Sequence, residues 1–198
     1  MEPYIKSITA IFTFSLLYSF SFGQTTQGGV LSQENSKEIS EYYCKQFIVD
    51  EILKVPTGQP IRITIDVITA AKSGELATVL YECSTLQKAG LVFAFWNGLW
   101  NGISPYKGFG FYGFNFDDAK ELLDSLEYLM NKGFTSPTSD SWNLVYKTKN
   151  LTFLFFDPNG YSESSDIRVW WQTFDSDWNQ NNLRTTIRRF RKFFNLPK

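Results

Sequence analysis

The sequence predicts an α+β fold, with a mostly antiparallel sheet that carries helices packed on one face. Residues 61–67 alternate between aliphatic and polar side chains, the period of a strand with one solvated face. Residues 118–130 and 183–194 instead carry apolar side chains at helical spacing. Strands followed by a helix occur twice along the chain, which suggests duplicated strand-strand-strand-helix units.

A short helix is predicted first. Asn35 and Glu38 have the spacing of a capping box, in which each side chain satisfies a backbone amide at the start of a helix. Ile39, Tyr43 and Phe47 then recur every four residues, so that they share one face of the helix.

Three strands follow in the first half of the chain. Residues 61–67 and 76–83 flank a turn-forming segment at 72–75, which predicts a hairpin. The apolar run at 91–96 predicts a third strand, which leads into a glycine-rich stretch.

A long helix is predicted next. Asp118 is suited to cap it, and Glu121 has the reciprocal spacing. Lys132 and Gly133 mark its end. One face of this helix is apolar and consists of Ala119, Leu122, Leu123, Leu126 and Met130. Such a face is expected to cover a sheet.

The second half repeats this order of elements. Strands are predicted at 142–147, 151–157 and 166–174, separated by turns. A final helix is predicted from four apolar residues at helical spacing, Leu183, Ile187, Phe190 and Phe194.

The first residues have the features of a secretory signal peptide. An apolar stretch at 8–17 is too short and too rich in Ser and Thr for a transmembrane helix, and small residues stand at Ser21 and Gly23. We therefore expect residues 1–23 to be removed and the protein to be secreted or periplasmic. The mature chain would consist of a flexible N-terminal lead at 24–35 and a single globular domain at 36–198, without a transmembrane segment.

Composition narrows the chemistry. The chain has no His, which removes the commonest general base, the commonest metal ligand and every nucleophile pair that uses His. The formal net charge is −1, so bulk electrostatics indicates no partner. An enzyme is therefore the less favoured class, and neither a cofactor nor a metal site is predicted.

Two cysteines are candidates for a disulfide. Cys44 and Cys83 would close a loop of about 40 residues, which the loop-entropy model values at about 3 to 4 kcal/mol. Export favours the bond, but the sequence does not supply the geometry that it needs. Two buried, reduced thiols are the alternative.

Aromatic residues provide the candidate ligand-binding residues. Strand alternation places Trp170 with Arg168 and Gln172 on one face and Trp171 on the other, so that Trp170 is a candidate stacking platform. Trp96 and Trp100 lie in an aromatic and glycine-rich stretch that either approaches a ligand or fills the core of a long hairpin.

Charged residues suggest two alternative functions. Arg184, Arg188 and Arg191 form a basic stripe on the last helix that could bind a polyanion or a membrane surface, although nucleic acid is not expected as the partner. A carboxylate-based glycan hydrolase needs only two acids, and three cluster at Asp117, Asp118 and Glu121, where helix electrostatics also explains them.

A second acidic pattern, Asp175, Asp177 and Asn179, begins like a calcium loop. It lacks the turn glycine and the bidentate Glu of such a loop, which leaves it as an ordinary helix-capping segment.

The leading hypothesis is an exported, non-enzymatic domain that binds a protein or small ligand through aromatic surface residues. The glycan hydrolase and the binder of polyanions or membrane surfaces are the alternatives.

Overall fold

The α+β class is confirmed by a computed structural model, which describes residues 23–27, 41–68, 76–100, 105–131, 143–148, 150–156 and 166–197. Two antiparallel sheets account for the strands. The first sheet has the order β1 (Gly23–Gln27), β5 (Pro105–Asn115), β4 (Lys88–Trp100), β3 (Leu76–Cys83), β2 (Thr64–Ile68). The second has the order β6 (Asn143–Lys147), β7 (Thr152–Phe156), β8 (Asp166–Trp171), β9 (Phe174–Asn179).

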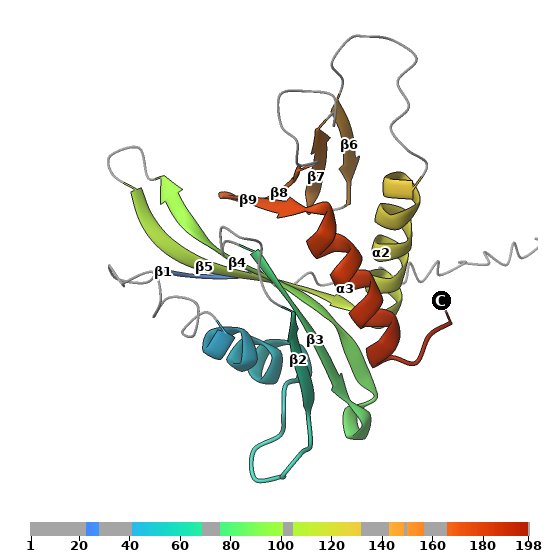
Figure 1. Cartoon of the computed structure of the whole chain (residues 1–198). Coiled ribbons are helices and arrows are strands. Elements are labelled where there is room, and N and C mark those ends of the chain that lie inside the picture. The colour runs from blue at the N-terminus through green and yellow to red at the C-terminus, as the bar shows by residue number, and fades with distance from the viewer. Residues whose placement is uncertain are drawn as a thin grey trace, which may run out of the picture.

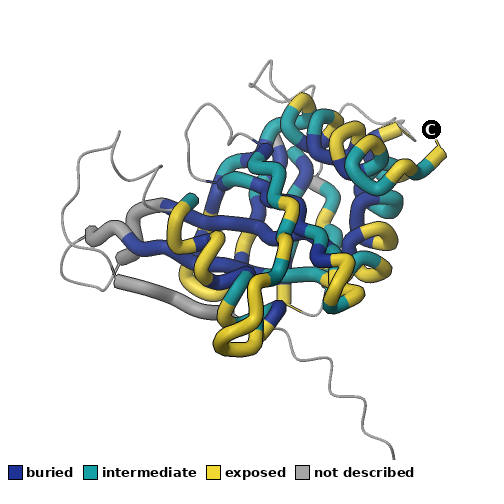
Figure 2. The backbone as a smooth tube through the Cα atoms, turned by 90° about the horizontal axis from the view of Figure 1, so that it is seen from below, coloured by how far each residue is buried: buried dark blue, intermediate teal, exposed yellow. Residues whose placement is uncertain are grey.

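The helices lie on both faces of the first sheet (Figure 1). Residues 41–47 are helical and continue into the π-helix η1 (Ile48–Leu53), on one face. On the other face lie α2 (Phe116–Asn131), α3 (Gln180–Phe193) and the second sheet. A short 3-10 helix, η2 (Ser84–Leu86), joins β3 to β4. The strands that cross the middle of Figure 2 are therefore largely buried.

Alternation along β4 divides the core into two clusters. Phe93 and Phe95 point toward α2, α3 and the second sheet, in a cluster with Trp171 and Trp178. Val92, Ala94 and Trp96 point the other way, toward the helix at 41–53. The first sheet thus has two buried faces, which explains why β4 reads as a continuous apolar run.

One glycine shows how the two sheets approach each other. A Cβ atom at Gly110 would lie 2.5 Å from Cζ3 of Trp171, closer than van der Waals contact allows. The rings of Trp171 and Phe174 stack with their centroids 5.7 Å apart, and Phe95 lies 5.3 Å from Trp171. The glycine-rich stretch therefore makes room for core rings rather than for a ligand at this position.

The predicted disulfide is absent, because Cys44 and Cys83 are both free thiols. Both are buried in the cluster beneath the first sheet, where they act as small apolar side chains. Burial, with a smaller contribution from Glu41, raises the pKa of the Cys44 thiol to about 12, so this cysteine is protonated at neutral pH.

The number of strands was underestimated. Among the described residues, five strands precede α2 and four precede α3, because the glycine-rich stretch forms β5 and Phe174–Asn179 forms β9, whose last residue, Asn179, also caps α3 as expected. Gly23–Gln27, predicted as the cleavage site and the start of a flexible lead, pairs with β5 as the edge strand β1. Residues 1–22 and 28–40 lie outside the described residues.

The predicted capping box of α2 is shifted by three residues. The amide of Asp118 donates to Oδ1 of Asn115 at 2.8 Å, and Nδ2 of Asn115 donates to Oδ2 of Asp118 at 3.0 Å. Asn115 is therefore the N-cap, and Glu121 has no role in the cap.

Candidate functional site

The outer face of the second sheet combines apolar and charged side chains. We define this outer face by residues that share it through cross-strand pairing: Val145, Lys147, Thr152, Leu154, Phe156, Arg168, Trp170, Asp175 and Asp177. Their neighbours in sequence, such as Phe153 and Trp171, point inward and are buried. Strand alternation therefore separates a core face from a face that contacts solvent.

Trp170 is held in place on this face. It is 38 % exposed, whereas Trp171 is 2 % exposed, which confirms the predicted alternation. The indole Nε1 of Trp170 donates to Oδ1 of Asp175, directly opposite on β9, at 2.7 Å. This bond to a carboxylate fixes the ring through its polar edge and leaves part of its surface in solvent.

Arg168 joins Trp170 to a small charged network. Its Nε donates to Oδ1 of Asp177 at 2.9 Å, and its Nη1 lies 3.4 Å from Oδ2 of Asp175. All three side chains are substantially exposed to solvent, so the network contributes more to the orientation of Trp170 than to stability.

The apolar part of the face was missed by the sequence analysis. Val145 is 56 % exposed and lies opposite Leu154 on the neighbouring strand, and Leu154 in turn lies opposite Arg168. Phe156, two residues further along β7, is half-buried. The sequences of β6 and β7 carry no clear polar and apolar alternation, so these residues are recognised only once the strands are paired.

Three of the predicted ligand-binding residues do not belong to this face. Gln172 lies in the turn between β8 and β9, where its φ of 53° ends the strand before the predicted alternation reaches it. Trp96 is 6 % exposed and belongs to the core beneath the first sheet, so it is not a surface residue. Trp100 ends β4 opposite Pro105, and its side chain lies outside the described residues.

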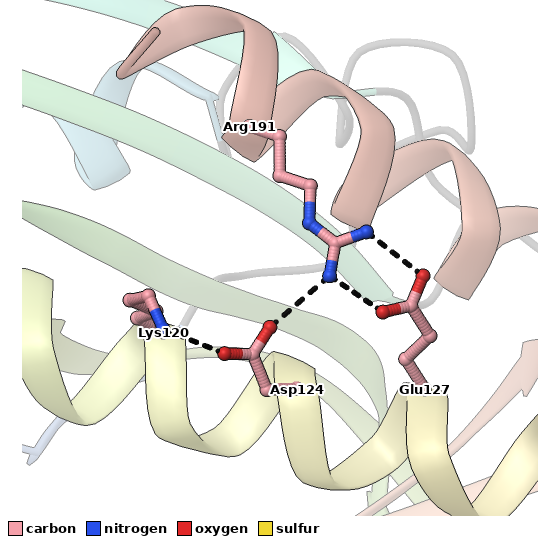
Figure 3. Close-up of polar contacts among 4 residues, drawn as sticks. All are labelled: Lys120, Asp124, Glu127 and Arg191. Atoms are coloured by element: carbon pink, nitrogen blue, oxygen red, sulfur yellow. Dashed lines mark hydrogen bonds and ion pairs between the residues drawn. The ribbon is translucent and has the colours of Figure 1, made fainter. Parts of the chain in front are cut away.

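The basic stripe of α3 is partly neutralised. Nη1 and Nη2 of Arg191 donate to the two carboxylate oxygens of Glu127 at 3.0 and 2.5 Å, and Nη2 also contacts Asp124 at 3.2 Å (Figure 3). The hydrogen bonds to Glu127 are the main reason why the pKa of Arg191 is raised. Arg191 therefore joins α3 to α2 and is not available to a polyanion.

Arg189, the neighbour of this stripe, contacts Asp66 on β2 at 3.2 Å. Arg184 and Arg188 are exposed on α3. The structure therefore leaves two of the three predicted polyanion-binding arginines at the surface, and the apolar face of the same helix is buried in the core.

The two acidic clusters do not have the arrangement that calcium binding or glycoside hydrolysis needs. Asp175 and Asp177 lie on a strand and contact Arg168, and no group of metal-ligating side chains occurs among the described residues. Asp117, Asp118 and Glu121 are exposed at the start of α2, and Asp118 takes part in the helix cap. Exposed carboxylates lack the dry surroundings that tune an acid for glycoside hydrolysis.

Comparison with known proteins yields no relative. No family model matches the chain, and no curated protein or solved structure is significantly similar to it. Among the described helices, none has both the length and the apolar character needed to cross a membrane. The function must therefore be inferred from the surfaces themselves.

Proposed function

We propose that this protein is an exported, non-enzymatic binding module, and that it docks a partner protein on the outer face of the second sheet. The observation that carries the proposal is the exposure of Trp170 and Val145 on the same face of a sheet whose other face is core. Exposed apolar patches with a polar rim are typical of sites that contact other proteins.

The composition of the face supports a partner protein. Trp and Arg are the residue types most enriched among those that dominate binding energy, and both occur here side by side. The hydrogen bond from Trp170 to Asp175 fixes the ring before any partner arrives. Because the ring is already ordered, its burial would cost little conformational entropy.

Export supports the same function from the sequence. Residues 1–23 have the pattern of a signal peptide, and cleavage after Gly23 would leave Gln24 at the N-terminus. N-terminal sequencing of the protein from the exported fraction tests this part directly. Recovery of the uncleaved chain there would contradict it.

Site-specific photocrosslinking in the producing cells tests the binding surface. A photoreactive phenylalanine analogue placed at Val145 should crosslink to one discrete protein. The same analogue placed at Tyr42, an exposed residue on the helix at 41–47, is the matched control and should give no such product. Equal products at the two positions, or none at Val145, would contradict the proposal, and a thermal-shift screen would then test the small-ligand alternative.

A further inference from the structure

A cleft of about 860 Å³ opens where β5 ends and α2 begins, away from the outer face of the second sheet. A second cavity of about 590 Å³ continues from it along α2. The two share three lining residues, Asp117, Glu121 and Tyr146. These volumes lie within the range of cavities that bind small organic ligands.

Two buried tyrosines line the larger cavity from opposite faces of the first sheet, Tyr112 in the cluster next to the second sheet and Tyr81 in the cluster beneath the first sheet. The hydroxyl of Tyr81 donates to the backbone oxygen of Phe114 at 3.2 Å. The hydroxyl of Tyr112 accepts from Nδ2 of Asn150 at 3.1 Å. Both rings are therefore fixed in position before a ligand binds.

Tyr146 lies between the two cavities. It is half-buried on β6, and its ring centroid is 6.2 Å from that of Phe153 in the core. A ring supported from within the core and open on its other side offers a flat surface on which an apolar ligand face can rest.

Glu121 and Asp117 supply hydrogen-bond acceptors at the same point. Asn115 and Asp118 form the cap of α2, so neither Glu121 nor Asp117 is needed for it. The two residues are four apart, and such like-charged pairs destabilise a helix by about 0.2 to 0.5 kcal/mol. The helix dipole stabilises only charges in the first turn, which does not extend to Glu121.

Further polar groups complete the lining, and the charged ones already have partners, because Asp118 accepts from Asn115 and Lys120 pairs with Asp124. Gln87, Asn115 and Thr148 lie around the larger cavity, and its cation, Lys88, already donates to the backbone oxygens of Ile52 and Leu53 at 2.8 and 3.3 Å. Aromatic rings interspersed with amide, hydroxyl and carboxylate groups suit a ligand that carries both apolar ring faces and many hydroxyls.

We propose that the two adjoining cavities bind a neutral oligosaccharide. One sugar ring lies against Tyr146, and Asp117 and Glu121 accept hydrogen bonds from its hydroxyls. The two cavities meet at Asp117, Glu121 and Tyr146, so a chain of several sugar units can extend from one cavity into the other. This site is separate from the outer face of the second sheet and does not depend on the partner proposed there.

Calorimetric titration of the purified protein tests the site. The probes are the neutral hexasaccharides of cellulose, xylan, mannan, starch and chitin, with hexalysine as the cationic comparison. We expect at least one hexasaccharide to bind and hexalysine not to bind. Binding of hexalysine alone, or no binding of any hexasaccharide at millimolar concentration, would overturn the proposal.

Variants then locate the binding. Tyr146→Ala and Glu121→Ala should each weaken the hexasaccharide at least tenfold, while Tyr42→Ala, an exposed tyrosine elsewhere, and Trp170→Ala leave its affinity unchanged. Denaturant melts establish that each variant is folded. Unchanged affinity in a folded Tyr146→Ala variant would overturn the site. Loss of affinity in Trp170→Ala would assign the sugar to the outer face instead.

Discussion

Trp170 and Trp171 are adjacent in the sequence but lie on opposite faces of β8, and 38 % and 2 % of their surfaces are exposed. Trp171 contacts Phe95 and Phe174 between the two sheets. Trp170 instead donates a hydrogen bond to Asp175 on the solvent side. Trp171 therefore supports the fold, whereas Trp170 keeps part of its ring at the surface.

Truncation of the two residues should have different effects on stability. Trp171→Ala removes a buried ring from the core and should lower the free energy of unfolding by about 3 to 5 kcal/mol. Trp170→Ala removes a partly exposed ring together with its hydrogen bond to Asp175, and should lower it by a smaller amount, about 1 to 2 kcal/mol. Urea unfolding of both variants measures the difference. Equally large losses would mean that Trp170 is also part of the core.

The sequence predicted the elements better than their contacts. The period-two alternation of β2 and β8 identified strands and the correct side of Trp170, because alternation is a local property of the backbone. For Trp96 the sequence left two interpretations open, and the structure supports the one in which its stretch fills the core. The segments that bury β4 on its two faces are distant in sequence, so the residues that Trp96 contacts could not be predicted.

Contacts between distant segments also limited what the sequence could predict about the candidate site. Arg168 and Trp170 were found from one strand, but Val145 and Leu154 join them only through strand pairing. Gln172 was misplaced because a two-residue turn ends β8 early. Arg191 was interpreted as a free cation because its partners, Asp124 and Glu127, lie more than 60 residues earlier in the chain.

The position of the α2 cap can be tested by substitution. Asn115→Ala removes the side chain that accepts from the amide of Asp118, and should lower the free energy of unfolding by about 0.5 to 2 kcal/mol. Glu121→Gln should leave it unchanged or raise it slightly, since a like charge beside Asp117 is removed. Thermal melts of the two variants measure this. A larger loss for Glu121→Gln would restore the cap predicted from the sequence.

Alkaline pH should destabilise the fold through two buried groups. Burial raises the pKa of Cys44 to about 12 and the pKa of Tyr81 to about 12, whereas the unfolded chain releases these protons near 9 and 10. The folded state holds the protons more tightly, so this stability is fully present below pH 9 and is lost as pH rises toward 12. Denaturant melts between pH 8 and 11 should show the loss.

Removal of either group should reduce that dependence. Cys44→Ala and Tyr81→Phe are expected to give shallower declines in stability above pH 9 than the unaltered protein. Exposed Tyr42→Phe is the matched control and should leave the decline unchanged. An equal decline in all four proteins would contradict the assignment to these groups.

The Arg191 network should contribute to the packing of α3 on α2. The side chain of Arg191 is 26 % exposed. We therefore expect Arg191→Met to lower the free energy of unfolding by about 1 to 2 kcal/mol, which is less than the loss expected when a fully buried ion pair is broken. Arg184→Met, exposed on the same helix, should change it by less than about 0.5 kcal/mol. Chemical denaturation in urea tests both, and equal effects would mean that the network adds nothing.

Acid should weaken the same network. Partial burial opposes the ionisation of Asp124, but hydrogen bonds from Lys120 and Arg191 outweigh it and lower the pKa of Asp124. A lowered pKa means that this stability is present above the unfolded value of about 4 and is lost as pH falls through the folded value. Melts between pH 6 and 2 should show a smaller loss in Asp124→Asn. An unchanged loss would exclude Asp124 as a contributor.

The affinity of the crosslinked partner for purified variants tests the central claim most directly. Once photocrosslinking at Val145 has identified that protein, calorimetry can compare its binding to the unaltered chain, to Trp170→Ala and to the control Tyr42→Ala. We predict that Trp170→Ala weakens binding at least tenfold, while Tyr42→Ala binds normally. Normal binding by a folded Trp170→Ala variant would contradict the assignment of the outer face as the binding surface.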